Sequence, residues 1–104
     1  MALISMCVRN TTGNGRLKYT KETLKSIGAT VNFNKHRLFI IDNDSDQETK
    51  DYLLNWVTAR HTFAALIIMD KNVGTAEGIN QGWRERAIGE YLLKIDDDVV
   101  THQP

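Results

Sequence analysis

Three consecutive carboxylates, Asp96, Asp97 and Asp98, follow the apolar run Tyr91–Ile95, which has the composition of a buried strand. Carboxylates packed this closely repel one another, and a cation among them relieves the repulsion. Aspartate oxygens suit Mg²⁺ or Mn²⁺, and Mg²⁺ commonly bridges carboxylates to substrate phosphates. The triplet is therefore a candidate metal site, although an acidic triplet on its own is most often a solvated turn.

Three earlier apolar runs also end in polar residues. The runs are Leu3–Val8, His36–Ile41 and Phe63–Met69, and the polar segments after them are Arg9–Thr11, Asp42–Ser45 and Asp70–Gly74. The second and third runs are almost continuously apolar, which is typical of strands covered on both faces of a parallel sheet. Ligands of such sheets bind at the carboxyl ends of the strands, so we expect the polar segments to converge there. Lys71 and Arg9 are the candidate contacts for a phosphate or a base.

Segments with helical periodicity separate these runs. The first helix is expected within Leu17–Ile27, and Gly28 is placed to end it. The second is expected to open at Ser45, whose side chain caps the helix while Glu48 closes a capping box. The apolar face of this second helix is predicted to consist of Tyr52, Leu53, Trp56 and Val57.

A third helix is expected to begin with Thr75 as its N-cap and to end at Gly89. Its buried stripe is predicted to consist of Ala76, Ile79, Trp83 and Ala87. Strands and helices that alternate with right-handed crossovers form a parallel sheet with helices on both faces. The sequence therefore predicts a single three-layer α/β domain over residues 1–104.

The composition, 41% hydrophobic and 25% charged, is typical of a soluble globular protein. Lysine and arginine balance aspartate and glutamate at 13 each, which disfavours binding to nucleic acid or to an anionic membrane. No apolar run approaches the roughly 20 residues that a membrane-spanning helix needs. The first residues lack a basic leader, and Cys7 is the one cysteine, which fits a reducing compartment. We therefore expect a cytoplasmic protein.

Two common nucleotide-binding motifs are missing. Gly13 and Gly15 hint at a dinucleotide fingerprint, but Lys18 stands where the third glycine would be. The sequence also has no P-loop motif, and its three histidines lack the spacing of metal ligands. Any nucleotide site must therefore be built in another way.

Taken in order, the segments resemble the N-terminal, nucleotide-binding half of family 2 glycosyltransferases, which have the GT-A fold. The resemblance starts with LISMCVRN, residues 3–10, and with FIIDNDSDQET, residues 39–49. It continues with NVGTAEGINQG, residues 72–82, and AIGEYLLKIDDD, residues 87–98, which matches the D-x-D block of the family. The last two blocks, at this spacing, are specific to the family.

The resemblance implies a sheet with strand order 3-2-1-4 and a donor that is a nucleotide-diphospho-sugar of the UDP or GDP type. It implies that Asp98, together with Asp96, binds Mn²⁺ or Mg²⁺, and that Asp96 or Asp97 faces the ribose or the sugar. The implied nucleotide-binding residues are Val8, Arg9, Asn10, Asp42, Asn43, Lys71, Asn72, Gly74, Asn80, Asp96 and Asp97.

Two positions depart from the family pattern. Asn43 stands where the family often has the acidic residue that recognises uracil, and its amide can both accept and donate a hydrogen bond. Arg9 stands where an aromatic residue often stacks on the base, and a guanidinium can stack as well. The preferred base therefore stays open at this point.

The resemblance also bears on the acceptor side. Family members carry, after the D-x-D block, the acceptor site and the carboxylate that activates the acceptor hydroxyl. We therefore expect residues 1–104 to be a donor-binding subdomain without an acceptor domain or catalytic base. The resemblance implies an inverting glycosyltransferase, and we expect the chain alone to be inactive in sugar transfer. An uncovered sheet edge could then support self-association. Two alternatives remain, a non-catalytic nucleotide-binding or interaction module and a nucleotidyltransferase-like domain.

Overall fold

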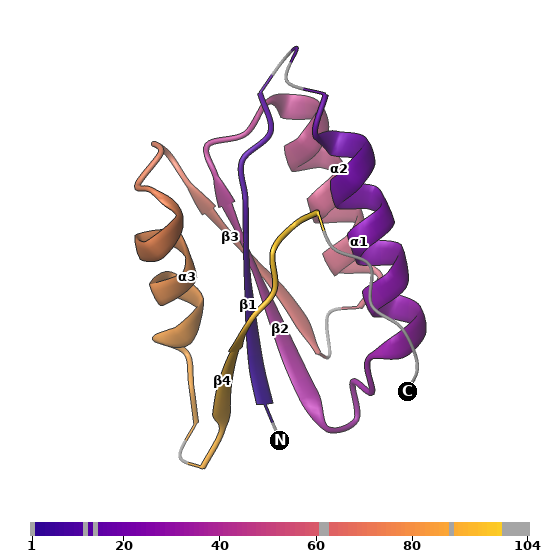
Figure 1. Ribbon diagram of the computed structural model, residues 1–104, viewed down its shortest axis with the longest axis vertical. Coiled ribbons are helices and arrows are strands. Elements are labelled where there is room, and N and C mark those ends of the chain that lie inside the picture. Colours follow the sequence, from indigo (N-terminus) through magenta and orange to yellow (C-terminus); the bar gives the residue numbers. More distant parts are fainter. Residues whose placement is uncertain (1, 12, 14, 61–62, 88, 99–104) are drawn as a thin grey trace.

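Four parallel strands form the centre of the molecule. This computed structural model describes residues 2–11, 13, 15–60, 63–87 and 89–98. The strands are β1 (Ala2–Val8), β2 (His36–Asn43), β3 (Ala64–Met69) and β4 (Tyr91–Lys94) (Figure 1). Their order is β3-β2-β1-β4, and every neighbouring pair is parallel. The predicted strand order 3-2-1-4 is confirmed. The order places β1 between β2 and β4, so the segments that follow these three strands are neighbours.

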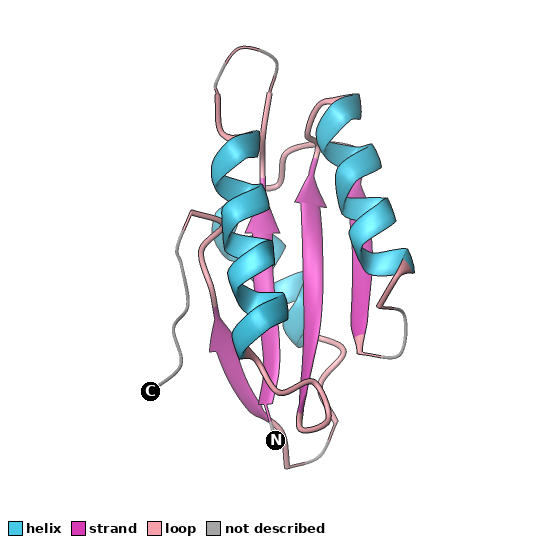
Figure 2. Cartoon of the chain, turned by 90° about the vertical axis from the view of Figure 1, so that its right-hand side faces the viewer, coloured by secondary structure: helices cyan, strands magenta, loops and turns pink. Residues whose placement is uncertain are grey.

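Three helices, α1 (Leu17–Thr30), α2 (Gln47–Thr58) and α3 (Thr75–Trp83), cover the two faces of the sheet. The helices α1 and α2 lie on one face and α3 on the other (Figures 1 and 2). The predicted three-layer α/β architecture is confirmed.

The face under α1 and α2 holds the main apolar core. Its largest buried members include Met6 from β1, Leu24 from α1 and Leu53 from α2. Trp56 and Val57 are buried in the same cluster, with Tyr52 packed against it, so the predicted apolar face of the second helix is confirmed. Burying an aliphatic side chain of this kind contributes about 1.5–3 kcal/mol.

The other face is packed by close approach rather than by large side chains. On α3 the buried residues are Gly78, Ile79 and Gly82. A Cβ atom added at Gly78 would lie 2.6 Å from Cys7 Sγ, and one at Gly82 would lie 2.9 Å from Ile41 Cδ1. These distances are shorter than real side-chain contacts, so α3 lies against the sheet only because both residues are glycine.

Glycine packing explains an error in the predicted third helix. Of its expected buried stripe, Ile79 is buried, Trp83 is half-buried and Ala76 is exposed. The helix ends at Trp83, so Ala87 lies beyond it, exposed, and Gly89 does not end it. The periodicity of apolar side chains misplaced the buried face because the closest contacts are made by residues without side chains.

Three helix termini also differ from expectation. Helix α1 continues through Gly28 to Thr30. The N-cap of α2 is Asp46, whose side chain accepts a hydrogen bond of 2.9 Å from the Thr49 amide, while Ser45 is buried at the end of the strands. The N-cap of α3 is Gly74, with a φ of 85° that favours glycine, and it makes no side-chain capping bond.

The fourth strand is an exposed edge, contrary to the expectation that Tyr91–Ile95 is a buried strand. Tyr91 is 75% exposed and Leu93 is 49% exposed. At the opposite edge of the sheet, Ile68 of β3 is 51% exposed, so the predicted coverage of both faces does not extend along that whole strand. None of the helices in the described part of the chain is long and apolar enough to cross a membrane.

Candidate functional site

A cleft of about 290 Å³ lies at the carboxyl end of the sheet, next to the triplet that follows β4. Its lining combines residues from β1, β4, α3 and the segment before α1: Cys7, Arg9, Arg16, Thr75, Ile79, Lys94, Asp96, Asp97 and Asp98. No β2 residue is among these described lining residues. The structure thus brings the ends of β1 and β4 together as the sequence predicts, whereas the end of β2 lies beside the cleft without lining it.

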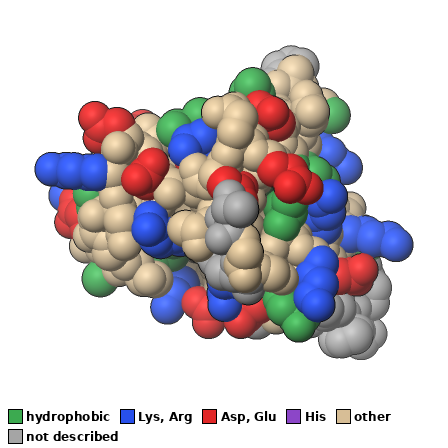
Figure 3. Space-filling view, turned by 90° about the horizontal axis from the view of Figure 1, so that it is seen from above, with side chains coloured by type: hydrophobic (Ala, Val, Ile, Leu, Met, Phe, Trp, Pro, Cys, Tyr) green, Lys and Arg blue, Asp and Glu red, His purple; other side chains and the backbone are tan. Residues whose placement is uncertain are grey.

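The charges that line the cleft are balanced. Three carboxylates, Asp96 to Asp98, face three cationic side chains, Arg9, Arg16 and Lys94. Acidic and basic side chains are also interspersed over the described part of this face in the view from above (Figure 3). The sign of the field alone therefore does not select the ligand, and the individual contacts decide what the cleft can bind.

Within the triplet, Asp97 is held and its two neighbours are exposed. The Asp97 side chain is 10% exposed and accepts hydrogen bonds from Arg16 Nη2 (2.9 Å) and Thr20 Oγ1 (3.3 Å). The Asp96 and Asp98 side chains are 59% and 50% exposed. The turn after β4 therefore buries its middle carboxylate against α1 and leaves the two outer carboxylates accessible.

Each exposed carboxylate has a cation within 4.0 Å. Lys94 Nζ lies 3.3 Å from Asp96 Oδ1, and Arg16 Nη2 lies 3.8 Å from Asp98 Oδ2. Exposed ion pairs of this kind contribute at most about 1 kcal/mol to stability, because solvent screens them and the side chains lose freedom. These contacts are therefore weak enough for a ligand to replace.

Asn10 connects the end of β1 to the end of β2. Its amide donates to Ser45 Oγ (2.9 Å), and its carbonyl accepts from the Asp46 amide (2.8 Å). Its side-chain Nδ2 donates to Thr20 Oγ1 (3.1 Å), which in turn donates to Asp97. Asn10 is only 1% exposed, so it holds these segments together from inside the fold.

Asp42 is fully buried at the end of β2. Its Oδ1 accepts from the Ser45 amide (3.2 Å), whereas its Oδ2 has no hydrogen-bond partner among the described residues. Lys50 Nζ lies 3.8 Å from that oxygen. An incompletely paired buried carboxylate is costly to the fold, and Lys50 offsets part of that cost.

Asn43 fastens the segment between β3 and α3 to the sheet. Its Oδ1 accepts from the Val73 amide (2.8 Å), and its Nδ2 donates to the Gly74 carbonyl (3.2 Å). The residue is 2% exposed. Both groups of the amide, which the sequence leaves free to recognise a base, are therefore engaged with the backbone.

Arg9 is exposed at the mouth of the cleft, and its guanidinium is fixed on one side. Its Nη1 donates to the carbonyls of Asn43 (3.1 Å) and Asp44 (3.2 Å). Two bonds to neighbouring carbonyls restrain the plane of the guanidinium and leave its faces uncovered by these bonds. Arg9 can therefore offer a flat cationic surface to a planar ligand.

Other predicted nucleotide-binding residues do not line the cleft. Val8 is completely buried under α1 and α2. Lys71, Asn72 and Gly74 lie exposed between β3 and α3, and Asn80 is exposed on α3. The structure thus separates the predicted set into residues that line the cleft, buried residues that hold its walls, and exposed residues outside it.

Several lining residues were not predicted from the sequence. Arg16 and Lys94 carry charge into the cleft, and Thr75, Ile79 and Cys7 form its wall near α3. Burial raises the pKa of the Cys7 thiol, which keeps it protonated and unreactive near neutral pH. The one available signal was Lys94, a charge within an otherwise apolar run; the position of Arg16 has no comparable signal.

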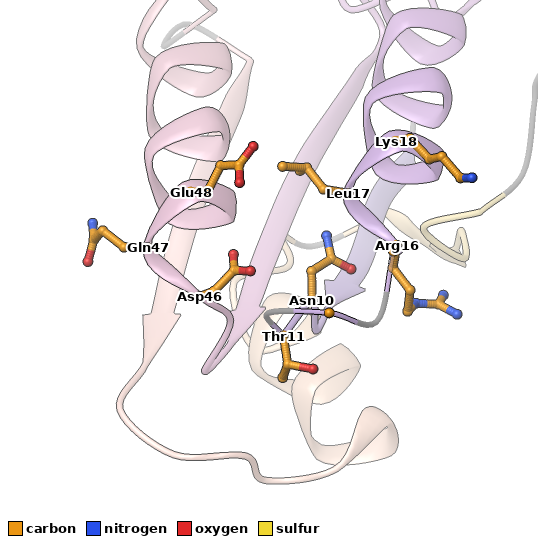
Figure 4. Close-up of a pocket in the computed structure, with 10 residues that line it drawn as sticks. Asn10, Thr11, Arg16, Leu17, Lys18, Asp46, Gln47 and Glu48 are labelled. Atoms are coloured by element: carbon orange, nitrogen blue, oxygen red, sulfur yellow. The ribbon is translucent and has the colours of Figure 1, made fainter.

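A second and larger cavity, of about 580 Å³, lies between the N-terminal ends of α1 and α2 (Figure 4). Arg16 and Lys18 line it from the α1 side, and Asp46, Gln47 and Glu48 line it from the α2 side. Arg16 also lines the cleft beside the triplet. The Arg16 side chain therefore lies between the larger cavity and the cleft beside the triplet.

The sequence model of glycosyl transferase family 2 matches residues 4–103. The chain belongs to this family. The resemblance noted from the sequence is confirmed. No curated protein matches the chain significantly.

Solved structures share the fold at low sequence identity. Residues 1–349 of TarS from S. aureus align with a TM-score of 0.71 and 20% identity, over 96% of this chain and 28% of that one. TarS in complex with UDP gives a TM-score of 0.72 at 20% identity, over 94% and 28% of the two chains. The mannosyltransferase PcManGT from Pyrobaculum calidifontis, in complex with GDP-Man and Mn²⁺, gives a TM-score of 0.72 at 20% identity, over 94% of this chain and 28% of that one. The chain thus spans 28% of the length of these structures, and the GT-A-like fold is confirmed.

Proposed function

We propose that this chain is the donor-binding part of a glycosyltransferase that binds a nucleotide-diphospho-sugar together with Mn²⁺ or Mg²⁺. The observation that carries the proposal is the cleft in which Asp96 and Asp98 stand exposed beside the end of β1. Membership of glycosyl transferase family 2 supports it. So do the bound ligands of the similar structures, UDP in TarS and GDP-Man with Mn²⁺ in PcManGT.

The residues of the cleft fit a divalent metal that is shared with a ligand. The described residues contain no group of three or more side chains that could by itself hold a metal ion. Two exposed carboxylates, Asp96 and Asp98, are nevertheless available, and Mg²⁺ is often bound by one or two carboxylates plus substrate phosphates and water. When bound, the metal would neutralise charge that develops on the departing diphosphate.

The other predicted residues take distinct roles in this proposal. Arg9 stacks on the base, and Asp97 faces the ribose or sugar from its place beside Arg16. Asn10, Asp42, Asn43 and Val8 act from inside the fold by holding the ends of the strands and the segment before α3. Lys71, Asn72, Gly74 and Asn80 remain proposed nucleotide contacts from positions outside the cleft.

The reaction proposed for the whole enzyme is direct displacement of the diphosphate by an acceptor hydroxyl, with inversion. Direct displacement needs a held donor, a stabilised leaving group and a base within hydrogen-bond reach of the acceptor. The cleft supplies the first two, and we assign no described side chain to the third role. We therefore propose that this chain binds donor in the cytoplasm but transfers no sugar alone. Exposed Tyr91 and Leu93 on the edge strand β4 are the proposed surface for self-association.

Calorimetry with UDP and GDP, in excess Mn²⁺ and then in EDTA, tests the proposal. We expect binding in Mn²⁺ and loss of at least about 10-fold in affinity in EDTA, because a diphosphate without a metal adds about three negative charges to a cleft whose described charges balance. Asp98→Ala should remove the dependence on metal. Asp70→Ala is the matched control, since Asp70 is an exposed carboxylate that follows β3 at the opposite edge of the sheet.

The same titrations separate the alternative functions. Equal affinity in Mn²⁺ and EDTA would contradict the metal site and favour a non-catalytic nucleotide-binding or interaction module. Clear preference for UTP or GTP over the diphosphates would favour a nucleotidyltransferase-like domain.

A further inference from the structure

We infer that Arg16 and Lys94 are exchangeable counter-ions of the Asp96–Asp98 segment, so that the cleft binds a divalent cation and a nucleoside diphosphate together and each alone only weakly. This inference rests on the proposed donor site and specifies how that site is regulated by its own charges. It follows from the contacts of two cationic residues that come from different parts of the chain, the end of β4 and the segment before α1.

Lys94 and Arg16 each lie within 4.0 Å of an exposed carboxylate. Lys94 Nζ is 3.3 Å from Asp96, and Arg16 Nη2 is 3.8 Å from Asp98. A divalent cation that bound these carboxylates without a phosphate would stand beside two positive side chains. Its attraction to the carboxylates would be offset by repulsion from these cations, because charges a few ångströms apart interact strongly at a partly shielded site.

Charge balance favours joint binding. The described residues that line the cleft carry three negative and three positive side chains, so their charges balance before a ligand binds. A divalent metal alone adds two positive charges, and a nucleoside diphosphate alone adds about three negative charges at neutral pH. Bound together they add about one negative charge, so the pair disturbs the balance least.

The geometry also shows which contacts can be exchanged. Arg16 donates a hydrogen bond of 2.9 Å to the buried Asp97, and that bond keeps the guanidinium at the site. Its 3.8 Å approach to Asp98 is longer than a hydrogen bond and can be given up. A guanidinium that is 41% exposed is well placed to bind a phosphate oxygen while the metal takes over Asp98.

Arg16 is therefore a positioning residue for Asp98 as well as a phosphate contact, and the two roles predict effects of opposite sign. Removing its charge should strengthen binding of the metal alone, because a repelling cation is lost. It should weaken binding of the diphosphate in the presence of metal, because an attracting cation is lost. A purely structural role would weaken both kinds of binding.

The test measures three binding equilibria of the full chain. Binding of Mn²⁺ alone is followed by the electron paramagnetic resonance signal of the free ion. Binding of UDP in EDTA and binding of UDP in saturating Mn²⁺ are measured by calorimetry. For Arg16→Gln we expect Mn²⁺ alone to bind about 5- to 10-fold more tightly and UDP with Mn²⁺ to bind about 5- to 10-fold more weakly. Lys94→Gln should show the same opposite changes at a smaller size, because within the described part of the chain Lys94 pairs with Asp96 alone.

Two further variants keep the test decisive. Arg16→Lys retains the charge, so its affinity for Mn²⁺ alone should stay at the wild-type value. Lys18→Gln removes an exposed cation of α1 that does not line the cleft, and it should change none of the three equilibria. Thermal unfolding of every variant shows whether it is folded. If Arg16→Gln does not fold, Lys94→Gln and Arg16→Lys still give the required comparison.

The outcomes distinguish this inference from the proposed function. One outcome is that the wild-type chain binds UDP only with Mn²⁺ while Arg16→Gln and Lys94→Gln change the affinities for Mn²⁺ alone and for UDP with Mn²⁺ in the same direction, or change neither. That result would overturn the counter-ion inference and leave the donor site standing. Wild-type chain that binds UDP equally well with and without Mn²⁺ would overturn both. Opposite shifts in Arg16→Gln, absent in Arg16→Lys and Lys18→Gln, would support both.

Discussion

An arginine–carboxylate pair stands at each end of the sheet, and the two pairs differ in burial. At the amino end, the Glu90 side chain is 3% exposed and is bound by both Nε and Nη2 of Arg37 and by the Ala87 amide (2.7 Å). At the carboxyl end, Arg16 donates a hydrogen bond to Asp97. The next residue in the chain, Asp98, is half-exposed.

The same residue types serve the fold at one end of the sheet and remain accessible at the other. The bonds of Glu90 close the segment between α3 and β4 onto the start of β2, so its carboxylate is fully used by the fold. Among the described residues, the carboxylates of Asp96 and Asp98 have weak, solvent-screened partners, and both side chains are at least half-exposed. Charge at the amino end thus stabilises the structure, and charge at the carboxyl end is available for binding.

The largest effect on stability is expected at the amino end, for Glu90→Gln. Breaking a buried ion pair typically costs about 3–5 kcal/mol, and the partial exposure of Arg37 reduces our expectation to about 2 kcal/mol. Urea unfolding at pH 7 measures the loss. Glu22→Gln, an exposed substitution on α1, is the control and should stay within about 0.5 kcal/mol of wild type. An equal loss in both variants would contradict the comparison.

The same pair predicts how stability depends on pH. The hydrogen bond from Arg37 lowers the pKa of Glu90 below its ordinary value of 4.5. The stabilisation is therefore complete above about pH 4.5 and is lost as the pH falls through the lowered pKa. We expect the stability difference between wild type and Glu90→Gln to shrink below pH 4.5. Urea titrations at a series of pH values from 7 downward measure it, and a constant difference would mean that Arg37 does not lower this pKa.

A smaller effect is expected for Asn43→Asp, which restores the acidic residue that the family often has. The substitution replaces the donor to the Gly74 carbonyl with a second carboxylate oxygen, so two acceptors would meet at about 3.2 Å. We expect a loss of about 1–2 kcal/mol in stability and no gain in preference for UDP over GDP. A stable variant with a new preference for UDP would show that Asn43 faces the base rather than the backbone.

The smallest effects are expected within the triplet. Asp97→Asn should cost about 1 kcal/mol, because Arg16 and Thr20 lose a charged acceptor, whereas Asp96→Ala and Asp98→Ala should change stability by less than about 0.5 kcal/mol. Chemical unfolding of the three variants, set beside their UDP titrations in Mn²⁺, sharpens the contrast. A large loss of stability in Asp98→Ala would place its role in the fold.

Local sequence patterns were sufficient to predict the order of strands and helices and the family. Almost continuous apolar runs predicted the strands, and apolar periodicity predicted the buried face of α2, because both patterns follow from the geometry of a single segment. The blocks at residues 72–82 and 87–98 indicated family 2, and they placed the carboxylates at the end of β4.

Which polar residues remain accessible depends on contacts between distant parts of the chain. Arg16 meets Asp97 across 81 positions of the sequence, and Asn43 meets Val73 and Gly74 across 30 and 31 positions. Such contacts depend on the order of the strands and on the direction of each side chain, which no local pattern contains. For the same reason the close approach of Gly78 and Gly82 to the sheet, the exposure of β4 and the pairing of Asp96 and Asp98 with Lys94 and Arg16 became visible only in the folded chain.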